Sequence, residues 1–334
     1  MPRSSHADNV SLRLRSRAID QESRRILISR IEDSKQAEDL SVPPNCEGYG
    51  RIRHFRRHAG ALWPDNPLPI DPAASSLGIA PSDVFRAQVF QNAVCNWRCW
   101  YCYVPYSLLS GSRDLSRWFT ADELLDLYLE QSEPPQMIDL TGGQLDLTPE
   151  WILWILEAIQ RRGFERSIYL WSDDNLSNDF FWRFLSDEDI SKLARAKNYG
   201  RVGCFKGFDA DSFEFNTNAD PRLFDGQFEL FDRFLSTGID LYAYGTFTCL
   251  DSCGIPDKMA QFVDRLQTVH ENLPLRLILL EIRSFSAVES RLTPQLVATM
   301  QNQAIAIESW NRELSQRFST SQRAARINDI PMSR

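Results

Sequence analysis

The chain has 334 residues with 43% hydrophobic and 25% charged side chains, and a net charge of −8. This balance is typical of a soluble globular protein and excludes a disordered, collagen-like or coiled-coil chain. The apolar runs are far shorter than the roughly 20 residues that a membrane span needs. The excess of 45 acidic over 37 basic residues argues against broad electrostatic contact with nucleic acid.

The first 83 residues differ in composition from the rest. Residues 1–6 lead into no apolar stretch, so no secretory signal is expected and we predict a cytoplasmic protein. Residues 1–40 carry Leu and Ile at loosely helical spacing among charged residues, which predicts an exposed helical arm. Residues 41–83 hold seven of the 17 prolines, which predicts an irregular extension. Its basic segment 51–58 is either a solvated arm or an anion-binding lip over an active site.

From residue 84 onward, patterns typical of strands and helices alternate. Thr120 and Glu123 form a capping box for one helix, and a second helix runs between Thr148 and Gly163. Further helices are predicted at 227–235, 256–269 and 293–317. Strands are predicted at 84–94, 137–141, 167–172, 201–206, 239–248 and 275–282. Six strands that alternate with helices indicate parallel βαβ units, which suit a barrel-like or a doubly wound sheet. The segment 286–334 is predicted to be a helical extension.

Three of the seven cysteines lie together directly after the first predicted strand. Cys95, Cys99 and Cys102 have the spacing C-x3-C-x2-C. Thiolates bind soft metals and iron–sulfur clusters, and three of them can hold three irons of a cubane while the fourth iron stays open. The alternative is a zinc site completed by Cys46, Cys204 or a histidine. Zinc sites usually use paired C-x2-C spacings, and the sequence has no second pair.

The triplet, with Tyr101 immediately before its last cysteine, resembles the C-x3-C-x-aromatic-C signature of the radical S-adenosylmethionine (SAM) superfamily. The resemblance extends over residues 84–285 at distances typical of the family, and it implies a partial (β/α)6 TIM-like barrel of parallel strands with N- and C-terminal extensions. It also implies a 4Fe-4S cluster on the three cysteines and SAM as the second cofactor, with Tyr101 beside them. In the family, an electron from the cluster cleaves SAM to a 5′-deoxyadenosyl radical, which abstracts hydrogen from the substrate. A flavodoxin or ferredoxin is the kind of electron donor expected.

The same resemblance assigns SAM contacts at the ends of two strands. Gly142, Gly143 and Gln144 stand where the family has a Gly-Gly-Glu type motif that holds the SAM ammonium group, although Gln144 lacks the glutamate's charge. Ser172 and Asp174 stand where polar side chains bind the ribose hydroxyls. Asp173 and Asp174 could instead cap a helix.

At the fourth strand end, residues 204–209 resemble the Asp-Leu-Lys segment of glycyl-radical-enzyme activating enzymes. There the lysine, which Lys206 matches, meets the SAM carboxylate. Cys204 stands in the aspartate's place and is otherwise explained as a small core residue.

Substrate-facing residues are expected at the carboxyl ends of the last strands, where barrel active sites lie. Tyr244, Thr246 and Thr248 share one face by period two, and we expect this polar face to point inward. Glu281 and Arg283 interrupt an apolar run, so they either contact substrate or pair structurally. Tyr244 and Glu281 are the catalytic candidates from this set, and Asp139 is a weaker candidate of the same kind.

Three functions remain open from the sequence. The first is a radical SAM enzyme that acts on an unidentified small molecule or nucleotide. The second is an activase or modifying enzyme that acts on a partner protein, as residues 205–207 suggest. The third is a non-catalytic iron–sulfur or zinc protein. Cys46, Cys249 and Cys253 are either ligands of an auxiliary cluster or unligated thiols, and the absence of a further cysteine run favours the latter.

Overall fold

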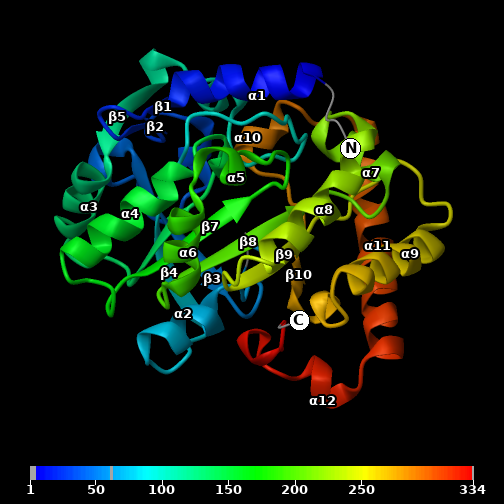
Figure 1. Cartoon of the computed structure of the whole chain (residues 1–334). Helices are drawn as coiled ribbons and strands as arrows, with labels where there is room; N and C mark the ends of the chain where they lie inside the picture. Colours follow the sequence, from blue (N-terminus) through cyan, green and yellow to red (C-terminus); the bar gives the residue numbers. More distant parts are fainter. Residues whose placement is uncertain (1–4, 61–62, 333–334) are drawn as a thin grey trace.

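The computed structural model describes residues 5–60 and 63–332, and its main feature is a seven-stranded sheet (Figure 1). The strands, in sheet order, are β10 (Leu277–Leu279), β9 (Leu241–Gly245), β8 (Tyr199–Phe205), β7 (Tyr169–Asp174), β6 (Met137–Leu140), β4 (Val84–Phe90) and β3 (Gly50–Arg56). β4 and β6 to β10 are parallel and neighbour one another in chain order, whereas β3 is antiparallel to β4. A doubly wound sheet would reverse its strand order. This sheet does not, and β3 and β10 stay unpaired with each other, so the partial (β/α)6 TIM-like barrel is confirmed.

Helices from the connections cover the outer face of the sheet (Figure 1). They are α3 (Ala121–Leu129), α4 (Glu150–Arg161), α5 (Phe180–Phe184), α6 (Asp187–Arg195), α7 (Ala210–Thr217), α8 (Phe224–Leu235) and α9 (Ile255–Val269). Outward strand residues such as Leu140 and Phe205 pack with these helices in the largest apolar cluster. Inward residues such as Trp171 and Tyr242 form a second cluster inside the barrel. The alternation of side chains along each strand therefore separates a helix-facing layer from an interior layer.

The remaining elements lie before, between and after the barrel units. They are α1 (Ser5–Ala18), β1 (Ile19–Asp20), β2 (Arg25–Ser29), α2 (Ile70–Leu77), β5 (Ser116–Thr120), α10 (Ser286–Glu289), α11 (Pro294–Arg317) and α12 (Thr320–Arg323). Short 3-10 turns occur at Lys35–Asp39, Cys46–Gly48, Tyr106–Leu109, Arg113–Leu115, Leu145–Leu147, Pro221–Leu223, Leu273–Arg276 and Ile327–Asp329. β2 pairs antiparallel with both β1 and β5 in a small second sheet.

The predictions for residues 1–83 need two corrections. The first segment is not an exposed helical arm, because β2 is buried in the small sheet and Arg15 of α1 forms a buried ion pair with Glu150. Residues 41–83 are not irregular throughout, because β3 pairs with β4 along its whole length and α2 follows it. The prolines flank β3 rather than interrupt it. The division of the chain into four segments stays a prediction.

The helix boundaries were predicted more accurately than the ends of the strands. The capping box of Thr120 and Glu123 is present, and α11 begins at Pro294 after an N-cap at Thr293. For α4, however, the N-cap is Pro149 rather than Thr148. β9 and β10 are shorter than predicted because the chain leaves the sheet after Gly245 and Leu279 to line a cavity.

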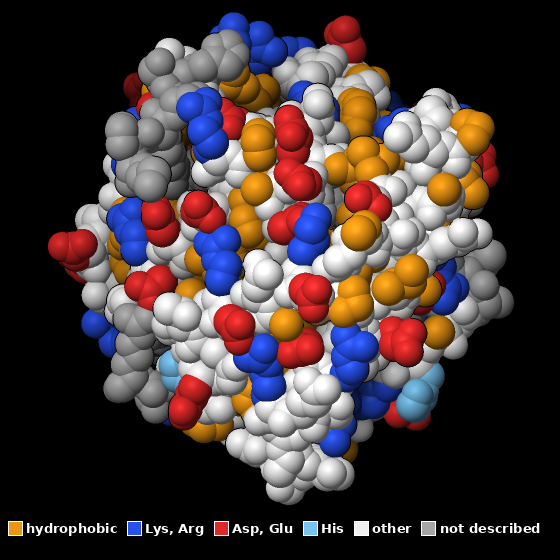
Figure 2. All heavy atoms as spheres, turned by 90° about the vertical axis from the view of Figure 1, so that its right-hand side faces the viewer, with side chains coloured by type: hydrophobic (Ala, Val, Ile, Leu, Met, Phe, Trp, Pro, Cys, Tyr) orange, Lys and Arg blue, Asp and Glu red, His pale blue; other side chains and the backbone are white. Residues whose placement is uncertain are grey.

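Figure 2 views the molecule from the side of α9 and α11 and shows acidic and basic side chains intermingled over this face. No separate basic field is seen there, as the overall negative charge leads one to expect. Among residues 5–60 and 63–332, no helix has both the length and the apolar character required to cross a membrane.

Candidate active site

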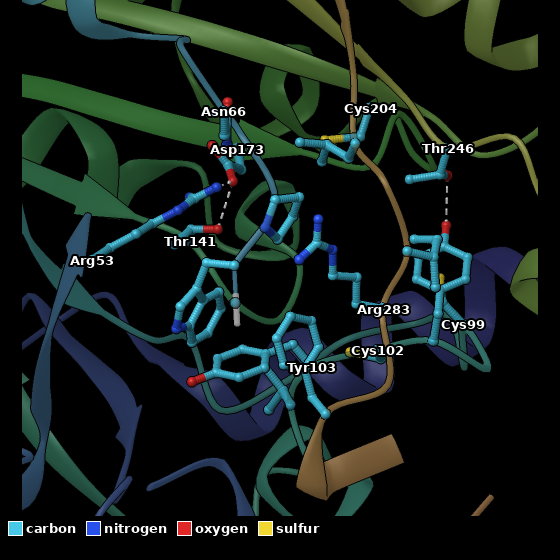
Figure 3. A pocket seen from close by; sticks show the side chains of 18 of the residues that line it. Arg53, Asn66, Cys99, Cys102, Tyr103, Thr141, Asp173, Cys204, Thr246 and Arg283 are labelled. Atoms are coloured by element: carbon cyan, nitrogen blue, oxygen red, sulfur yellow. Dashed lines mark hydrogen bonds and ion pairs between the residues drawn. The ribbon is translucent and has the colours of Figure 1, made fainter. Parts of the chain in front are cut away.

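A cavity of about 320 Å³ opens at the carboxyl ends of the parallel strands (Figure 3). Its wall combines the inner face of β3, the cysteine loop, the ends of β6 to β8 and the segments after β9 and β10. Most of the site residues expected from the sequence line this cavity. They are Cys95, Cys99, Tyr101, Cys102, Gly142, Gly143, Asp174, Lys206 and Glu281, together with Asp173, Cys204, Thr246 and Arg283. Gln144, Ser172, Tyr244 and Thr248 do not line it.

The cysteine loop is held by hydrogen bonds to its backbone. The amide of Trp100 donates to the carbonyl of Asn216 at 3.3 Å, and the Tyr106 hydroxyl donates to the carbonyl of Cys99 at 2.8 Å. The Arg291 guanidinium donates to the carbonyl of Cys102 at 2.7 Å. These bonds come from α7, from the chain after the loop and from the chain before α11. The loop conformation is therefore fixed by the barrel and not by contacts among the thiols.

All seven cysteines are free thiols. Burial raises the pKa of the Cys95 thiol to about 11 and that of Cys99 to about 12, so both are neutral in the metal-free chain. Within the described residues, no group of three or more His, Cys, Asp or Glu side chains converges on one point as a single metal ion requires. A cubane cluster differs, because each cysteine binds a different iron. Three thiols on one cavity wall fit that donor set, and the other cysteines except Cys204 lie away from the cavity.

The turn after β6 brings backbone into the cavity. Gly142 and Gly143 have φ values of +84° and +72°, and a Cβ on Gly143 would lie 2.5 Å from the carbonyl oxygens of Asn92 and Val94. Only glycine fits there, so the turn is specified by the sequence. The Gln144 side chain points away from the cavity, because its amide donates to Asp174 Oδ1 at 2.6 Å and accepts from the Asn175 amide at 3.0 Å.

Neighbouring polar side chains at the end of β7 point to opposite faces of the sheet. Asp173 faces the cavity, where its Oδ2 accepts from Thr141 at 2.6 Å. Ser172 lies on the other face, where its hydroxyl bonds to that of Tyr199 at 2.8 Å. The Asp174 carboxylate is also directed outward and lies 3.0 Å from Arg201. The Asp173 carboxylate, rather than Ser172 or Asp174, is thus the polar side chain that this strand presents to a ligand.

Lys206 extends the end of β8 into the cavity beside Cys204. Burial alone would lower the pKa of the Lys206 ammonium, but the acidic groups of Cys204, Tyr101 and Cys99 around it raise the pKa above its ordinary value. Tyr101 is held by a 2.7 Å hydrogen bond between its hydroxyl and that of Thr246.

The two substrate candidates from the last strands are placed differently. Glu281 and Arg283 both line the cavity and lie 3.4 Å apart as an ion pair, and Figure 3 shows Arg283 reaching into the middle of the cavity. Tyr244 lies deeper, in the apolar interior cluster, and its hydroxyl donates to the carbonyl of Leu68 at 2.9 Å. Thr248 bonds to Asn216.

A network on β3, β6 and β7 was predicted only in separate parts. The sequence offered Asp139 as a weaker candidate, Asp173 at the end of the third predicted strand, and residues 51–58 as either a solvated arm or an anion-binding lip. Arg53 donates to Asp139 at 2.9 Å and lies 3.4 Å from Asp173 (Figure 3). Burial and the charge of Asp173 raise the pKa of Asp139 to about 7. The signal that could have found this network is the alternation of Arg51, Arg53 and Phe55 along one strand face.

We expect Asp139→Asn to change how stability depends on pH. Between pH 3.8 and about 7, folded wild type holds a proton on Asp139 that the unfolded chain has released, so its stability falls as pH rises through this window. The variant lacks this titration, so its free energy of unfolding relative to wild type should rise across the window, by at most about 1.4 kcal/mol per pH unit. Urea unfolding at several pH values measures this.

Asp122→Asn is the control for that experiment. The pKa of Asp122 is lowered, first by its hydrogen bond to Arg161, so it titrates below this window. Its relative stability should stay flat above pH 5. A flat or falling curve for Asp139→Asn would contradict the raised pKa.

Comparisons with known proteins add the following. No model of a protein family matches the sequence, and no curated protein matches it. Solved structures of SuiB from Streptococcus suis are similar to this chain. SuiB bound to the precursor peptide SuiA is 15% identical with a TM-score of 0.39 and covers 54% of this chain. SuiB bound to S-adenosylmethionine is 14% identical with a TM-score of 0.44 and covers 70%. The matches span 36% and 48% of those SuiB chains, less than half their length.

Proposed function

We propose that the chain is a radical SAM enzyme, with a 4Fe-4S cluster on Cys95, Cys99 and Cys102 and SAM beside it. The observation that carries this proposal is that the thiols of a C-x3-C-x2-C loop, a glycine turn and a half-buried lysine line one cavity at the carboxyl edge of a partial barrel. Separately, each feature has an ordinary structural explanation. Their convergence on one cavity supports a site for a cluster and an amino-acid-like ligand.

When bound to Cys95, Cys99 and Cys102, a 4Fe-4S cluster would supply the electron for the reductive cleavage of SAM, which in turn would allow hydrogen abstraction from a substrate. The substrate is an unidentified small molecule or nucleotide in this proposal. The protein residues position and neutralise the ligand. Lys206 meets the SAM carboxylate as a single cation in a buried site, where charge-assisted hydrogen bonds are strong.

The glycine turn offers room and backbone polar groups for the amino end of SAM. We assign Asp173 to the ribose hydroxyls of SAM. Its Oδ1 is buried and accepts no hydrogen bond from the described residues, so it is free to accept one from a ligand. Gln144 is instead a positioning residue, since its amide joins Asp174 and the Asn175 backbone behind the site.

The test is anaerobic reconstitution with iron and sulfide, followed by reduction with dithionite in the presence of SAM. The expected product is 5′-deoxyadenosine, formed slowly even without substrate. A chain that carries the cluster and yields no 5′-deoxyadenosine would overturn the enzyme proposal. Zinc in place of iron would favour the structural alternative.

Lys206→Met is expected to raise the dissociation constant of SAM by about 10- to 100-fold, the cost of losing a hydrogen bond to a charged group. Equilibrium binding to the reconstituted protein measures this. Lys258→Met is the matched control, because Lys258 lies outside the cavity and pairs with Asp209 at 2.7 Å. Equal SAM affinity in both variants would contradict the proposed contact between Lys206 and SAM.

A further inference from the structure

The inner face of β3 carries two arginines with opposite surroundings. Arg51 and Arg53 are two residues apart, so both side chains point into the barrel and both line the cavity. Arg53 has acidic partners, because it donates to Asp139 at 2.9 Å and lies 3.4 Å from Asp173. Arg51 has no such partner.

Arg51 is only 7% exposed, and its Nε is buried without a hydrogen-bond partner. Its guanidinium forms no hydrogen bond or ion pair with the part of the chain that the structure describes. Its one specific contact is with the face of the Tyr103 ring, whose centroid lies 5.3 Å away. Burial lowers the pKa of Arg51, which reflects the cost of a charge without a partner. A buried charge of this kind is normally paired, so its partner is expected to be a ligand.

The charge of the cavity wall points to the same kind of ligand. Its cations among the described residues are Arg51, Arg53, Arg56, Lys206 and Arg283. Its acidic residues are Asp173, Asp174 and Glu281. The Asp173 carboxylate is already engaged by Arg53, and that of Asp174 is directed outward to Arg201. Lys206 follows β8, whereas Arg51 lies on the edge strand β3, against the ring of Tyr103. The wall therefore has positive charge left over at the β3 side after one SAM carboxylate is bound.

Arg283 can complete such a site from the other end of the sheet. It follows β10 and reaches into the middle of the cavity (Figure 3). Its pair with Glu281 is long, at 3.4 Å, and the two side chains are 28% and 43% exposed, so the pair is weak and can be exchanged for a stronger acceptor.

We propose that Arg51, with Arg283, binds an anionic group of the substrate, a carboxylate or a phosphate, at the β3 side of the cavity. The assignment of this group to the substrate rests on the proposed radical SAM function; the anion site itself does not. Guanidinium groups bind both anions through paired N–H donors, so the two chemistries are separated by experiment.

Thermal unfolding of the reconstituted protein, titrated with inorganic phosphate or with acetate at constant ionic strength, tests the site. Wild type should gain stability with one of these anions in a saturable manner. Arg51→Met should need at least tenfold more of that anion, and Arg51→Lys should lie between the two. A lower half-saturating concentration of phosphate than of acetate indicates a phosphate-bearing substrate, and the reverse order indicates a carboxylate.

Arg57→Met is the matched control, because Arg57 pairs with Asp71 and does not line the cavity. Its anion response should equal that of wild type. An anion response that is absent from wild type, or unchanged in Arg51→Met, would overturn the site.

Repeating the anion titration at saturating SAM shows whether the anion site belongs to the substrate or to SAM. If the site belongs to the substrate, SAM leaves the phosphate or acetate titration unchanged. Competition between SAM and the anion would assign Arg51 to SAM and overturn the substrate proposal. Failure of the radical SAM proposal would appear differently, as missing 5′-deoxyadenosine with the anion response intact.

Discussion

Cys99→Ala is expected to abolish the reductive cleavage of SAM and to lower the iron content of the reconstituted chain. The alanine leaves only two thiols in the cysteine loop, which cannot hold three irons of a cubane. The rate of 5′-deoxyadenosine formation should fall by more than about 100-fold, beyond what loss of an outer-shell partner of a metal site costs. Product formation and iron per chain, measured on the same preparation, check this.

Cys249→Ala is the matched control for that substitution. Cys249 is also a free thiol, but it lies outside the cavity and donates to the carbonyl of Asp251. Iron content and SAM cleavage should match wild type. If Cys99→Ala retained its iron and SAM cleavage, or if Cys249→Ala lost them, the proposed cluster-binding role of the cysteine loop would be contradicted.

Arg201→Met is expected to destabilise the fold by about 3–5 kcal/mol, the usual cost of removing one partner of a buried ion pair. Arg201 is fully buried on the helix-facing side of β8, 2.6 Å from Asp146 and 3.0 Å from Asp174. The substitution leaves two carboxylates in the core without their cation. Burial raises the pKa of Asp146 to about 7 even with Arg201 present, so the loss should be larger at pH 8 than at pH 5. Urea unfolding at the two pH values measures both effects.

Arg161→Met is the control on the surface. Its pair with Asp122 has side chains 54% and 46% exposed, so the loss should stay below about 1 kcal/mol. A loss for Arg201→Met as small as that of the control would mean that the buried triad does not hold β7 and β8 to the turn after β6.

The barrel was predictable because its signals are local. Each parallel strand is a short apolar run, and helices that follow are marked by capping or terminating residues. The cysteine triplet lies in the loop after β4. β3 was not predictable in the same way. The arginines of β3 and the prolines that flank it indicate exposed chain, and only pairing with β4, some 30 residues later, buries Arg51 and half-buries Arg53.

Side-chain direction at the strand ends was the other limit. The acidic pair after the third predicted strand could not be divided between cavity and core without the strand register, because one residue of shift exchanges the two faces. In the structure, Asp173 faces the cavity and Asp174 meets Arg201. The Gln144 side chain likewise points away from the cavity, and its position in the sequence alone could not indicate this direction. The triad of Asp146, Asp174 and Arg201 joins residues too far apart in sequence for any local pattern to indicate it.

The most direct measurement is the electron paramagnetic resonance spectrum of the reduced, reconstituted protein with and without SAM, together with metal analysis. The proposal predicts about four irons per chain and a cluster signal that changes when SAM binds the open iron. Zinc in the site, or a cluster signal that saturating SAM leaves unchanged, would contradict the claim that Cys95, Cys99 and Cys102 hold a cluster open to SAM.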